Sequence, residues 1–188
     1  TALNSVNHFV SQNDERTTNK FLSEFSRLMR LVMENSQEDF IPLYKEQEIL
    51  SLYVKLEHYR FRDKFDYAIS IDDAINQETV HLPPMLLQPY IENAIWHGLM
   101  NKQGRGLLKV RFEKINHTIR CEVLDNGVGR ARAAELGRQD QANRKRYGMS
   151  IAQRRLELLH KENQDIPDIR VEDLYDDQHQ PAGTRVSL

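Results

Sequence analysis

The first third of the chain carries apolar residues at the spacing of a helix. Between positions 15 and 35 they recur one, three or four residues apart, which predicts an amphipathic helix with a wide apolar stripe. A second helical stretch is predicted from Pro42, where Ile49, Leu52 and Leu56 repeat the pattern. Such stripes have to be buried, so we expect a helical bundle or a contact with a partner chain.

The spacing of the apolar residues then changes from that of a helix to that of a strand. Alternation over residues 65–71 predicts a strand, and residues 80–82 predict a short second one. A helix is expected from the Pro83-Pro84 pair to about Met100, because proline is well placed in the first turn of a helix.

The rest of the chain mixes strands with charged segments. Residues 107–112 and 118–124 predict a β-hairpin, and residues 130–146 predict a charged surface loop with room for one short helix. The remaining predicted elements are a helix at 151–159 and strands at 169–174 and 184–188. Helices followed by strands mixed with helices indicate a sheet with helices packed on one face, preceded by a helical segment.

Composition and charge exclude several classes of protein. With 188 residues, 39% hydrophobic and 29% charged, the chain matches one ordinary globular domain, alone or with a helical extension. A net charge of −2 offers no basic field, so no nucleic-acid partner is expected. The single cysteine, Cys121, excludes an internal disulfide framework, and its alternating neighbourhood favours core packing. The chain has no apolar run of the roughly 18 residues that a membrane span needs, and because it does not begin with Met we expect it to belong to a longer protein.

Asn93 and His97 form the first candidate site. They lie four residues apart in an expected helix, so their side chains share one face. An amide oxygen is a hard ligand suited to Mg²⁺, an ion that commonly bridges phosphates, and an imidazole can donate a hydrogen bond to a phosphate oxygen. Taken alone, the pair is also compatible with an ordinary polar patch.

The segment Asp125-Asn126-Gly127-Val128-Gly129 follows a predicted strand and forms the second candidate site. An ionised carboxylate only accepts hydrogen bonds, so Asp125 could bind the exocyclic amine of adenine. Gly127 and Gly129 lack a Cβ, which lets the backbone approach a ring or a phosphate closely. The arginines and the lysine at 130–146 could offset phosphate charge. Residue chemistry alone leaves two interpretations open, an anion or nucleotide site and a common turn before a solvated charged segment.

Together these motifs resemble the GHKL ATPase superfamily, and more closely the LytS/YehU-like sensor histidine kinases. Residues 87–98, Leu-Gln-Pro-Tyr-Ile-Glu-Asn-Ala-Ile-Trp-His-Gly, resemble the Mg²⁺–phosphate box of that family, and residues 125–129 resemble its first glycine box. Gly148 resembles the second glycine box, in which Arg146 stands at the position of the first glycine. Gly183-Thr184 resembles the closing pair before the last strand.

The resemblance implies an α+β fold, the GHKL (Bergerat) α/β sandwich, with a mixed sheet covered by helices on one face and with ATP and Mg²⁺ as cofactors. Residues 130–147 would form a lid over the ATP. The implied catalytic residues are Asn93, which also binds Mg²⁺, and His97, which contacts the phosphates. The other implied site residues are Asp125 for adenine, Gly127 and Gly129 for the shape of the adenine pocket, Gly148 for a helix N-terminus under the phosphates, and Thr184 for the adenine end.

The same resemblance divides the chain into two parts. Residues 1–62 would be a helical dimerisation and linker segment, incomplete at its N-terminus, and residues 63–188 the ATP-binding catalytic domain. Residues 2–5, Ala-Leu-Asn-Ser, resemble the tail of the motif that holds the phosphoacceptor histidine, which would then lie about four residues before Thr1. His8 lacks that context and is not assigned the role. The residues that match the linker helix of the family are Tyr53, Leu56, Glu57, Arg60 and Phe61.

The function implied by the resemblance is phosphorylation of a histidine with Mg-ATP, followed by transfer to the receiver domain of a response regulator. The protein would be a homodimer, and this part would lie on the cytoplasmic side of an inner-membrane protein that is anchored through its N-terminal region. Slow ATP hydrolysis is expected, because Gln88 and Pro89 stand where hydrolytic relatives place a water-activating Glu, and Glu92 should point away from Asn93.

Two alternatives stay open at this point. One is a serine kinase of the anti-sigma type, against which the predicted helix at 15–35 argues, because it resembles half of a dimerisation bundle. The other is an interaction module without ATP binding, which the departures at Arg146 and Ile151 from the second glycine box would suit.

Overall fold

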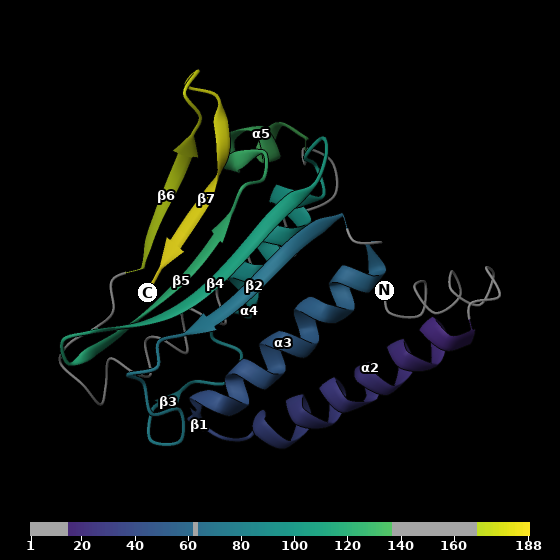
Figure 1. Cartoon of the computed structure of the whole chain (residues 1–188), viewed down its shortest axis with the longest axis vertical. Helices are drawn as coiled ribbons and strands as arrows, with labels where there is room; N and C mark the ends of the chain where they lie inside the picture. Colours follow the sequence, from purple (N-terminus) through teal and green to yellow (C-terminus); the bar gives the residue numbers. More distant parts are fainter. Residues whose placement is uncertain (1–14, 62–63, 137–168) are drawn as a thin grey trace.

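The computed structural model describes residues 15–61, 64–136 and 169–188. In these ranges two long helices precede a five-stranded sheet, and the shorter helices lie behind the sheet (Figure 1). The structure therefore confirms the expected α+β sandwich with a mixed sheet. None of the helices within the described ranges combines the length and the apolar character of a membrane span.

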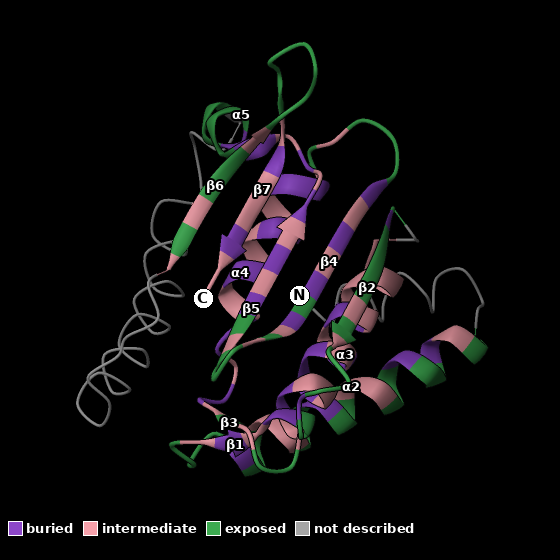
Figure 2. Ribbon diagram, turned by 60° about the vertical axis from the view of Figure 1, so that its left-hand side comes forward, coloured by how far each residue is buried: buried purple, intermediate pink, exposed green. Residues whose placement is uncertain are grey.

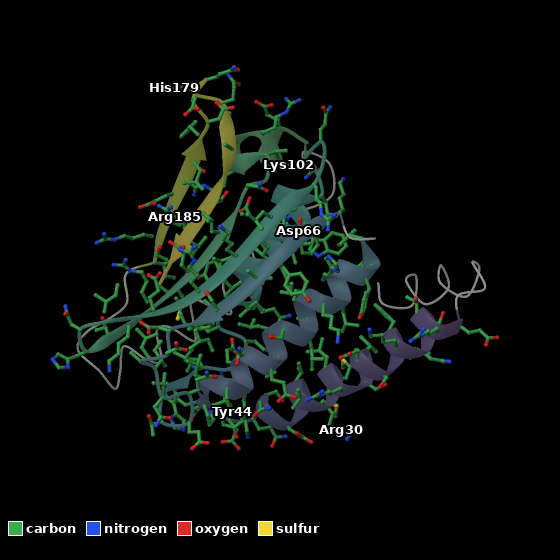
Figure 3. All side chains as sticks on the ribbon, viewed as in Figure 1. Arg30, Tyr44, Asp66, Lys102, His179 and Arg185 are labelled. Atoms are coloured by element: carbon green, nitrogen blue, oxygen red, sulfur yellow. The ribbon has the colours of Figure 1, made fainter. Side chains whose placement is uncertain are left out.

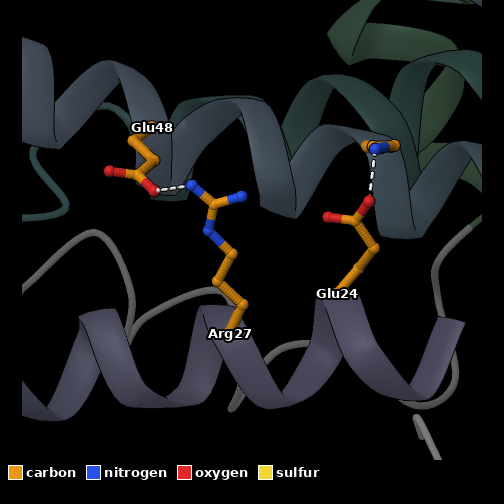
Figure 4. Close-up of polar contacts among 4 residues, drawn as sticks. Glu24, Arg27 and Glu48 are labelled. Atoms are coloured by element: carbon orange, nitrogen blue, oxygen red, sulfur yellow. Dashed lines mark hydrogen bonds and ion pairs between the residues drawn. The ribbon is translucent and has the colours of Figure 1, made fainter. Parts of the chain in front are cut away.

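The two long helices of the described residues, α2 (Glu15–Asn35) and α3 (Leu43–Arg60), form an antiparallel pair, as the periodicity predicts. Their apolar stripes meet in a cluster of Phe21, Leu28, Ile41, Ile49, Leu52 and Leu56. Two ion pairs flank this cluster: Arg27 contacts Glu48 at 2.5 Å, and Lys55 contacts Glu24 (Figure 4). The Arg27–Glu48 pair is exposed and contributes little to stability, so we expect the apolar cluster to be the main contact between the two helices.

The helix α3 begins one residue later than predicted. Pro42 lies outside the helix as its N-cap and belongs to β1 (Ile41–Pro42), which pairs antiparallel with β3 (His81–Leu82). The predicted strand at 80–82 is thus shorter, and it forms a separate two-stranded sheet instead of joining the main one.

The main sheet has the order β2-β4-β5-β7-β6. Only β2 and β4 run parallel among these neighbours, and every other pair is antiparallel. The predicted hairpin and the predicted last two strands are present, most of them longer than the sequence pattern suggested. The strands are β2 (Phe65–Ile71), β4 (Gly106–Ile115), β5 (Thr118–Asp125), β6 (Arg170–Tyr175) and β7 (Pro181–Ser187).

The two faces of the sheet differ in polarity. Along β4, Leu108, Val110 and Phe112 are fully buried against the helices, whereas the residues between them are more exposed (Figure 2). The other face carries charges in register: Arg185, which projects from β7 in Figure 3, contacts Glu122 at 3.2 Å and Glu172 at 3.1 Å. This alternation is typical of a sheet with one face packed on a core and one face in water.

Behind the sheet, the predicted helix at 83–100 is corrected in two ways. Its first part is not helical: α4 spans only Gln88–Asn93, and the chain continues as η1 (Ala94–Leu99), a π-helical segment. Before α4, Met85 adopts φ 56°, and its backbone N–H donates to Glu46 Oε2 at 2.7 Å. A residue in the left-handed region cannot belong to a right-handed helix, so the proline pair does not start one here.

The short helix α5 (Gly129–Leu136) falls in the charged segment where room for one short helix was expected. It packs against β7 and η1. The helix predicted at 151–159 lies outside the described residues, as do Gly148, Arg146 and His8.

Cys121 gives a direct test of the core. It is buried on β5, and this burial raises the pKa of its thiol to about 12, which confirms core packing over reactivity. We expect a thiol-specific reagent at pH 8 to modify the folded protein more slowly than the urea-unfolded protein by about a hundredfold or more, because the thiolate is the reactive form and the side chain is shielded. Equal rates in the two states, followed by absorbance, would contradict this packing.

Candidate functional site

A cavity of about 200 Å³ opens between the helical layer and one end of the sheet. It lies where β5 ends and where β7 and α5 begin. Its walls combine apolar and polar side chains, as expected of a small-molecule site. The lining residues are Tyr90, Asn93, Ala94, His97, Gly98, Val123, Asp125, Gly129, Arg130, Ala133, Val171, Thr184 and Val186.

This cavity collects five of the seven residues that the sequence motifs single out. Asn93 and His97 come from α4 and η1, Asp125 from the end of β5, Gly129 from the start of α5, and Thr184 from β7. Gly127 is not among the lining residues but lies directly behind them, and Gly148 lies outside the described part of the chain.

Asp125 is the buried acid of this site. Only 4% of its surface is exposed, and its Oδ1 accepts a hydrogen bond from the backbone N–H of Gly127 at 2.8 Å. Burial raises the pKa of this carboxyl to about 6, although the Gly127 N–H and the nearby Lys102 act in the opposite direction. A buried carboxylate of this kind strongly favours a ligand that brings a hydrogen-bond donor.

Gly127 and Gly98 let the turn of residues 125–129, which we call the acid turn, pack against η1. A Cβ on Gly127 would lie 2.3 Å from the backbone carbonyl carbon of Gly98, and a Cβ on Gly98 would lie 2.7 Å from Asp125 Oδ1. The contact is fixed by a hydrogen bond from the Val128 N–H to the Gly98 carbonyl oxygen at 3.2 Å. Gly98 and Gly127 therefore allow two backbone segments to pack closely against each other. The sequence analysis expected Gly127 to allow the close approach of a ligand, and it did not single out Gly98.

The strand β7 closes the other side of the turn. Thr184 is the register partner of Asp125, so its side chain lies beside the carboxylate in the cavity wall. The preceding residue, Gly183, has φ 139°, and a Cβ there would lie 2.0 Å from the Asp125 carbonyl oxygen. The close approach of β5 therefore leaves no room for a side chain at the position before Thr184.

Lys102 supports the acid turn from outside the cavity. Its Nζ donates to the Asn126 carbonyl oxygen at 2.5 Å, while Asn126 Oδ1 accepts the Leu107 N–H at 2.7 Å. Figure 3 shows Lys102 at the end of the sheet. Sequence reasoning did not identify this residue, because its 24-residue separation from Asn126 gives no local signal.

Arg130 and Arg132, the two basic residues of α5 after the acid turn, pair with carboxylates. Arg130, which lines the cavity, forms two hydrogen bonds of 2.7 Å with Asp173 on β6, and Arg132 pairs with Glu135 at 2.7 Å. A bidentate pair restrains the guanidinium, so Arg130 serves first to attach α5 to the edge of the sheet.

Glu92 points away from the cavity, as expected for a helical neighbour of Asn93. It accepts a hydrogen bond from Gln88 Nε2 at 2.8 Å and is not a lining residue. The carboxylate of Glu92 thus does not line the cavity with Asn93, and slow ATP hydrolysis stays a prediction that a phosphate-release assay can check.

The comparisons with known proteins point in one direction. The profile of the histidine kinase family matches residues 1–65. A sensor protein LytS from Oceanobacillus iheyensis is 32% identical over 122 residues, which are 65% of this chain and 20% of that protein. A sensor histidine kinase/phosphatase LytS from Staphylococcus aureus is 33% identical over 130 residues, or 68% of this chain and 22% of that protein. The chain thus spans about a fifth of the length of these curated relatives.

A solved structure has a similar fold. The histidine kinase domain of a blue-light activated histidine kinase from Erythrobacter litoralis superimposes with a TM-score of 0.53 at 15% identity, covering 91% of this chain and 72% of that one. At this identity the likeness concerns the fold alone. The chain therefore belongs to the family of LytS-like sensor histidine kinases, and its sandwich has the GHKL fold of histidine kinase catalytic domains.

Proposed function

We propose that the cavity binds the adenine of Mg-ATP and that the bound nucleotide phosphorylates a histidine. The observation that supports this is the buried Asp125 carboxylate in a largely apolar cavity, with Asn93 and His97 on the same wall. The carboxylate would accept the exocyclic amine of adenine, and the side chains of Val123, Val186 and Ala94 would contact the ring faces.

The size of the cavity suits a base better than a whole nucleotide. At about 200 Å³ it is smaller than a typical site for a drug-sized ligand, so the triphosphate would lie at the open side. There Asn93 would offer its amide oxygen to Mg²⁺, and His97 would contact phosphate oxygens. Among the described residues no cluster of three or more His, Cys, Asp or Glu side chains could hold a metal, so the phosphates would supply much of the coordination.

The phosphoryl transfer in this proposal needs positioning and charge neutralisation more than covalent chemistry from the protein. The acceptor would be a histidine in a segment ahead of Thr1, and the phosphate would pass on to an aspartate in the receiver domain of a response regulator. Residues 1–62 would be the dimerisation and linker segment, and residues 63–188 the catalytic domain.

The role of Asn93 can be tested by calorimetric titration of the chain with Mg-ATP. We expect Asn93→Ala to weaken Mg-ATP binding by about tenfold or more, because a metal ligand is lost, and to change Mg-free ADP binding much less. The matched control is Asn116→Gly at the far turn of the β4–β5 hairpin, where the residue already has φ 55°. If the wild type binds no nucleotide at millimolar concentration and Asn93→Ala behaves identically, an interaction module without ATP binding is the better account.

A second copy of the chain is the proposed partner of α2. Leu22, Met29 and Met33 are exposed on one side of this helix, Met33 with 68% of its surface, and spacings of seven and four residues place them on one face. The face continues the apolar stripe that packs on α3. An exposed apolar stripe of this kind is typical of a helix that pairs with another copy.

We expect Met29→Glu with Met33→Glu to shift the chain from dimer to monomer in sedimentation velocity, because two charges would be buried in the contact. Ser23→Glu, on the exposed polar side of the same helix, should leave the dimer intact. A wild type that stays monomeric at high micromolar concentration would contradict a dimer formed through this face.

A further inference from the structure

None of the five residues that match the linker helix of the family lines the cavity. All five lie in the second half of α3 or just after it: Tyr53, Leu56, Glu57, Arg60 and Phe61. Two of them, Arg60 and Phe61, contact Trp96 on η1. The Phe61 ring meets the Trp96 indole edge to face, with centroids 5.0 Å apart, and the Arg60 guanidinium lies 4.4 Å from the centre of the indole ring. A cation at this distance over an indole is a favourable contact.

Charged and polar groups extend this contact along both helices. Arg60 pairs with Glu57 at 3.4 Å, one turn earlier on α3. On the facing helix, Gln88 donates to Glu92 at 2.8 Å, and Trp96 follows Glu92 after four residues. Residues four apart in a helix lie on one side, so α4 and η1 present a continuous row to the end of α3.

An adjacent side of the same helical stretch forms part of the cavity wall. Asn93 precedes Trp96 by three residues, and His97 is its direct neighbour in the chain. A change in the position or the register of η1 that moves Trp96 would therefore also move His97. The hydrogen bonds of η1 define its register, because they join an N–H to the carbonyl oxygen five residues earlier. An example is the bond from the Met100 N–H to the Ile95 carbonyl oxygen at 2.9 Å. Such π-helical segments are rare and depend on local packing.

The contact also connects the two apolar cores of the molecule. Tyr53 packs against both the α2–α3 cluster and the core under the sheet, and Trp96 packs against the second of these. A displacement of α3 would therefore also move the side chains that contact η1.

We propose that Arg60 and Trp96 are positioning residues that clamp η1 against α3 and so set the orientation of Asn93 and His97 towards Mg-ATP. This inference rests on the proposed function of the cavity. A movement of the α2–α3 pair that shifts the end of α3 would loosen or tighten the clamp and so change the affinity for the nucleotide. Without the clamp, η1 would relax towards an α-helical register, which rotates His97 relative to Asn93.

Trp96 provides its own reporter, because it is the only tryptophan in the 188 residues. We expect Mg-ATP to change the intensity and acrylamide quenching of its fluorescence in the wild type. Arg60→Met keeps most of the apolar stem and removes the cation, so it should weaken Mg-ATP binding by about three- to tenfold and reduce the nucleotide-dependent fluorescence change. Arg27→Met is the matched control: it removes an ion pair from α2 to α3 far from Trp96 and should leave both readings unchanged.

A double-mutant cycle separates positioning from a general loss of stability. In a Trp96→Leu background, Arg60→Met should have little further effect on the dissociation constant, because its partner is gone. Additive effects, or Arg60→Met binding as tightly as the wild type, would overturn the clamp and leave the proposed function standing. A wild type that binds no Mg-ATP would overturn both. Urea titrations of each variant show whether a loss of binding follows from unfolding. An Arg60→Met variant that is unfolded under the binding conditions is replaced by Arg60→Gln, which also removes the cation; weaker binding is expected, and wild-type affinity would overturn the clamp.

Discussion

Asp125→Asn is expected to stabilise the ligand-free protein at pH 7 while it weakens adenine nucleotide binding by about tenfold to a hundredfold. The carboxyl has a pKa of about 6 in the folded protein, against about 3.9 in an unfolded chain. Ionisation of the buried group therefore costs folding free energy, and an amide of the same shape avoids that cost. We expect a gain of about 1–3 kcal/mol in the free energy of unfolding, measured by urea denaturation.

The pH dependence of this effect has a definite sign. Because the folded state holds the proton more tightly than the unfolded state, the contribution of Asp125 to stability is fully present below about pH 4 and is lost as the pH rises through about 6. The advantage of Asp125→Asn should thus be large at pH 7 and vanish near pH 4. Nucleotide binding should weaken from pH 7 to pH 5 in the wild type, because the protonated carboxyl is a poorer acceptor.

Asp66→Asn is the matched control for this prediction. Asp66 is an exposed carboxyl on β2 that pairs with Arg105 at 2.6 Å, so its replacement should change stability only slightly and nucleotide binding not at all. If Asp125→Asn instead destabilises the protein at pH 7, the carboxylate is stabilised in the folded state by contacts stronger than its burial penalty.

Gly127→Ala is expected to destabilise the fold by about 3 kcal/mol or more and to remove nucleotide binding. The added methyl group would lie 2.3–2.4 Å from the backbone of Gly98, and neither segment can yield easily because the Val128 N–H bonds to the Gly98 carbonyl oxygen. The acid turn would have to move away from η1, and Asp125 would leave its place in the cavity. Thermal unfolding and calorimetric titration measure the two effects.

Gly104→Ala separates this steric effect from the cost of replacing any glycine. Gly104 has φ 81° in a loop, and a Cβ there would meet nothing within 4 Å, so only the backbone strain of about 1 kcal/mol is expected. Equal destabilisation by the two variants would show that the close contact between Gly127 and Gly98 is not what makes the first one sensitive.

The sequence was most informative where a local pattern decides the structure. The apolar stripe of α2, the hairpin of β4 and β5 and the burial of Cys121 follow from side-chain spacing along one segment, and the structure confirms each of them. The sequence motifs also singled out Asn93, His97, Asp125, Gly129 and Thr184, which share one cavity, although their roles towards a nucleotide stay predictions.

The sequence patterns did not predict contacts between residues far apart in the chain. The start of α4 depends on Glu46, which lies 39 residues before Met85 and bonds to its backbone, so proline spacing alone gave the wrong boundary. The guanidinium of Arg130 pairs with Asp173, 43 residues away. The parallel pairing of β2 with β4 needs a crossover connection that no local pattern specifies.

The chain by itself thus determined its family, its amphipathic helices, its alternating strands and the residues from which a nucleotide site could be built, because periodicity and motif chemistry are properties of short segments. The tertiary structure alone decided the sheet order, the π-helical segment η1, the close approach of Gly98 to Gly127, and the contact of Arg60 and Phe61 with Trp96. These features arise from packing and burial among residues far apart in the chain, where the fit of one surface against another selects the conformation.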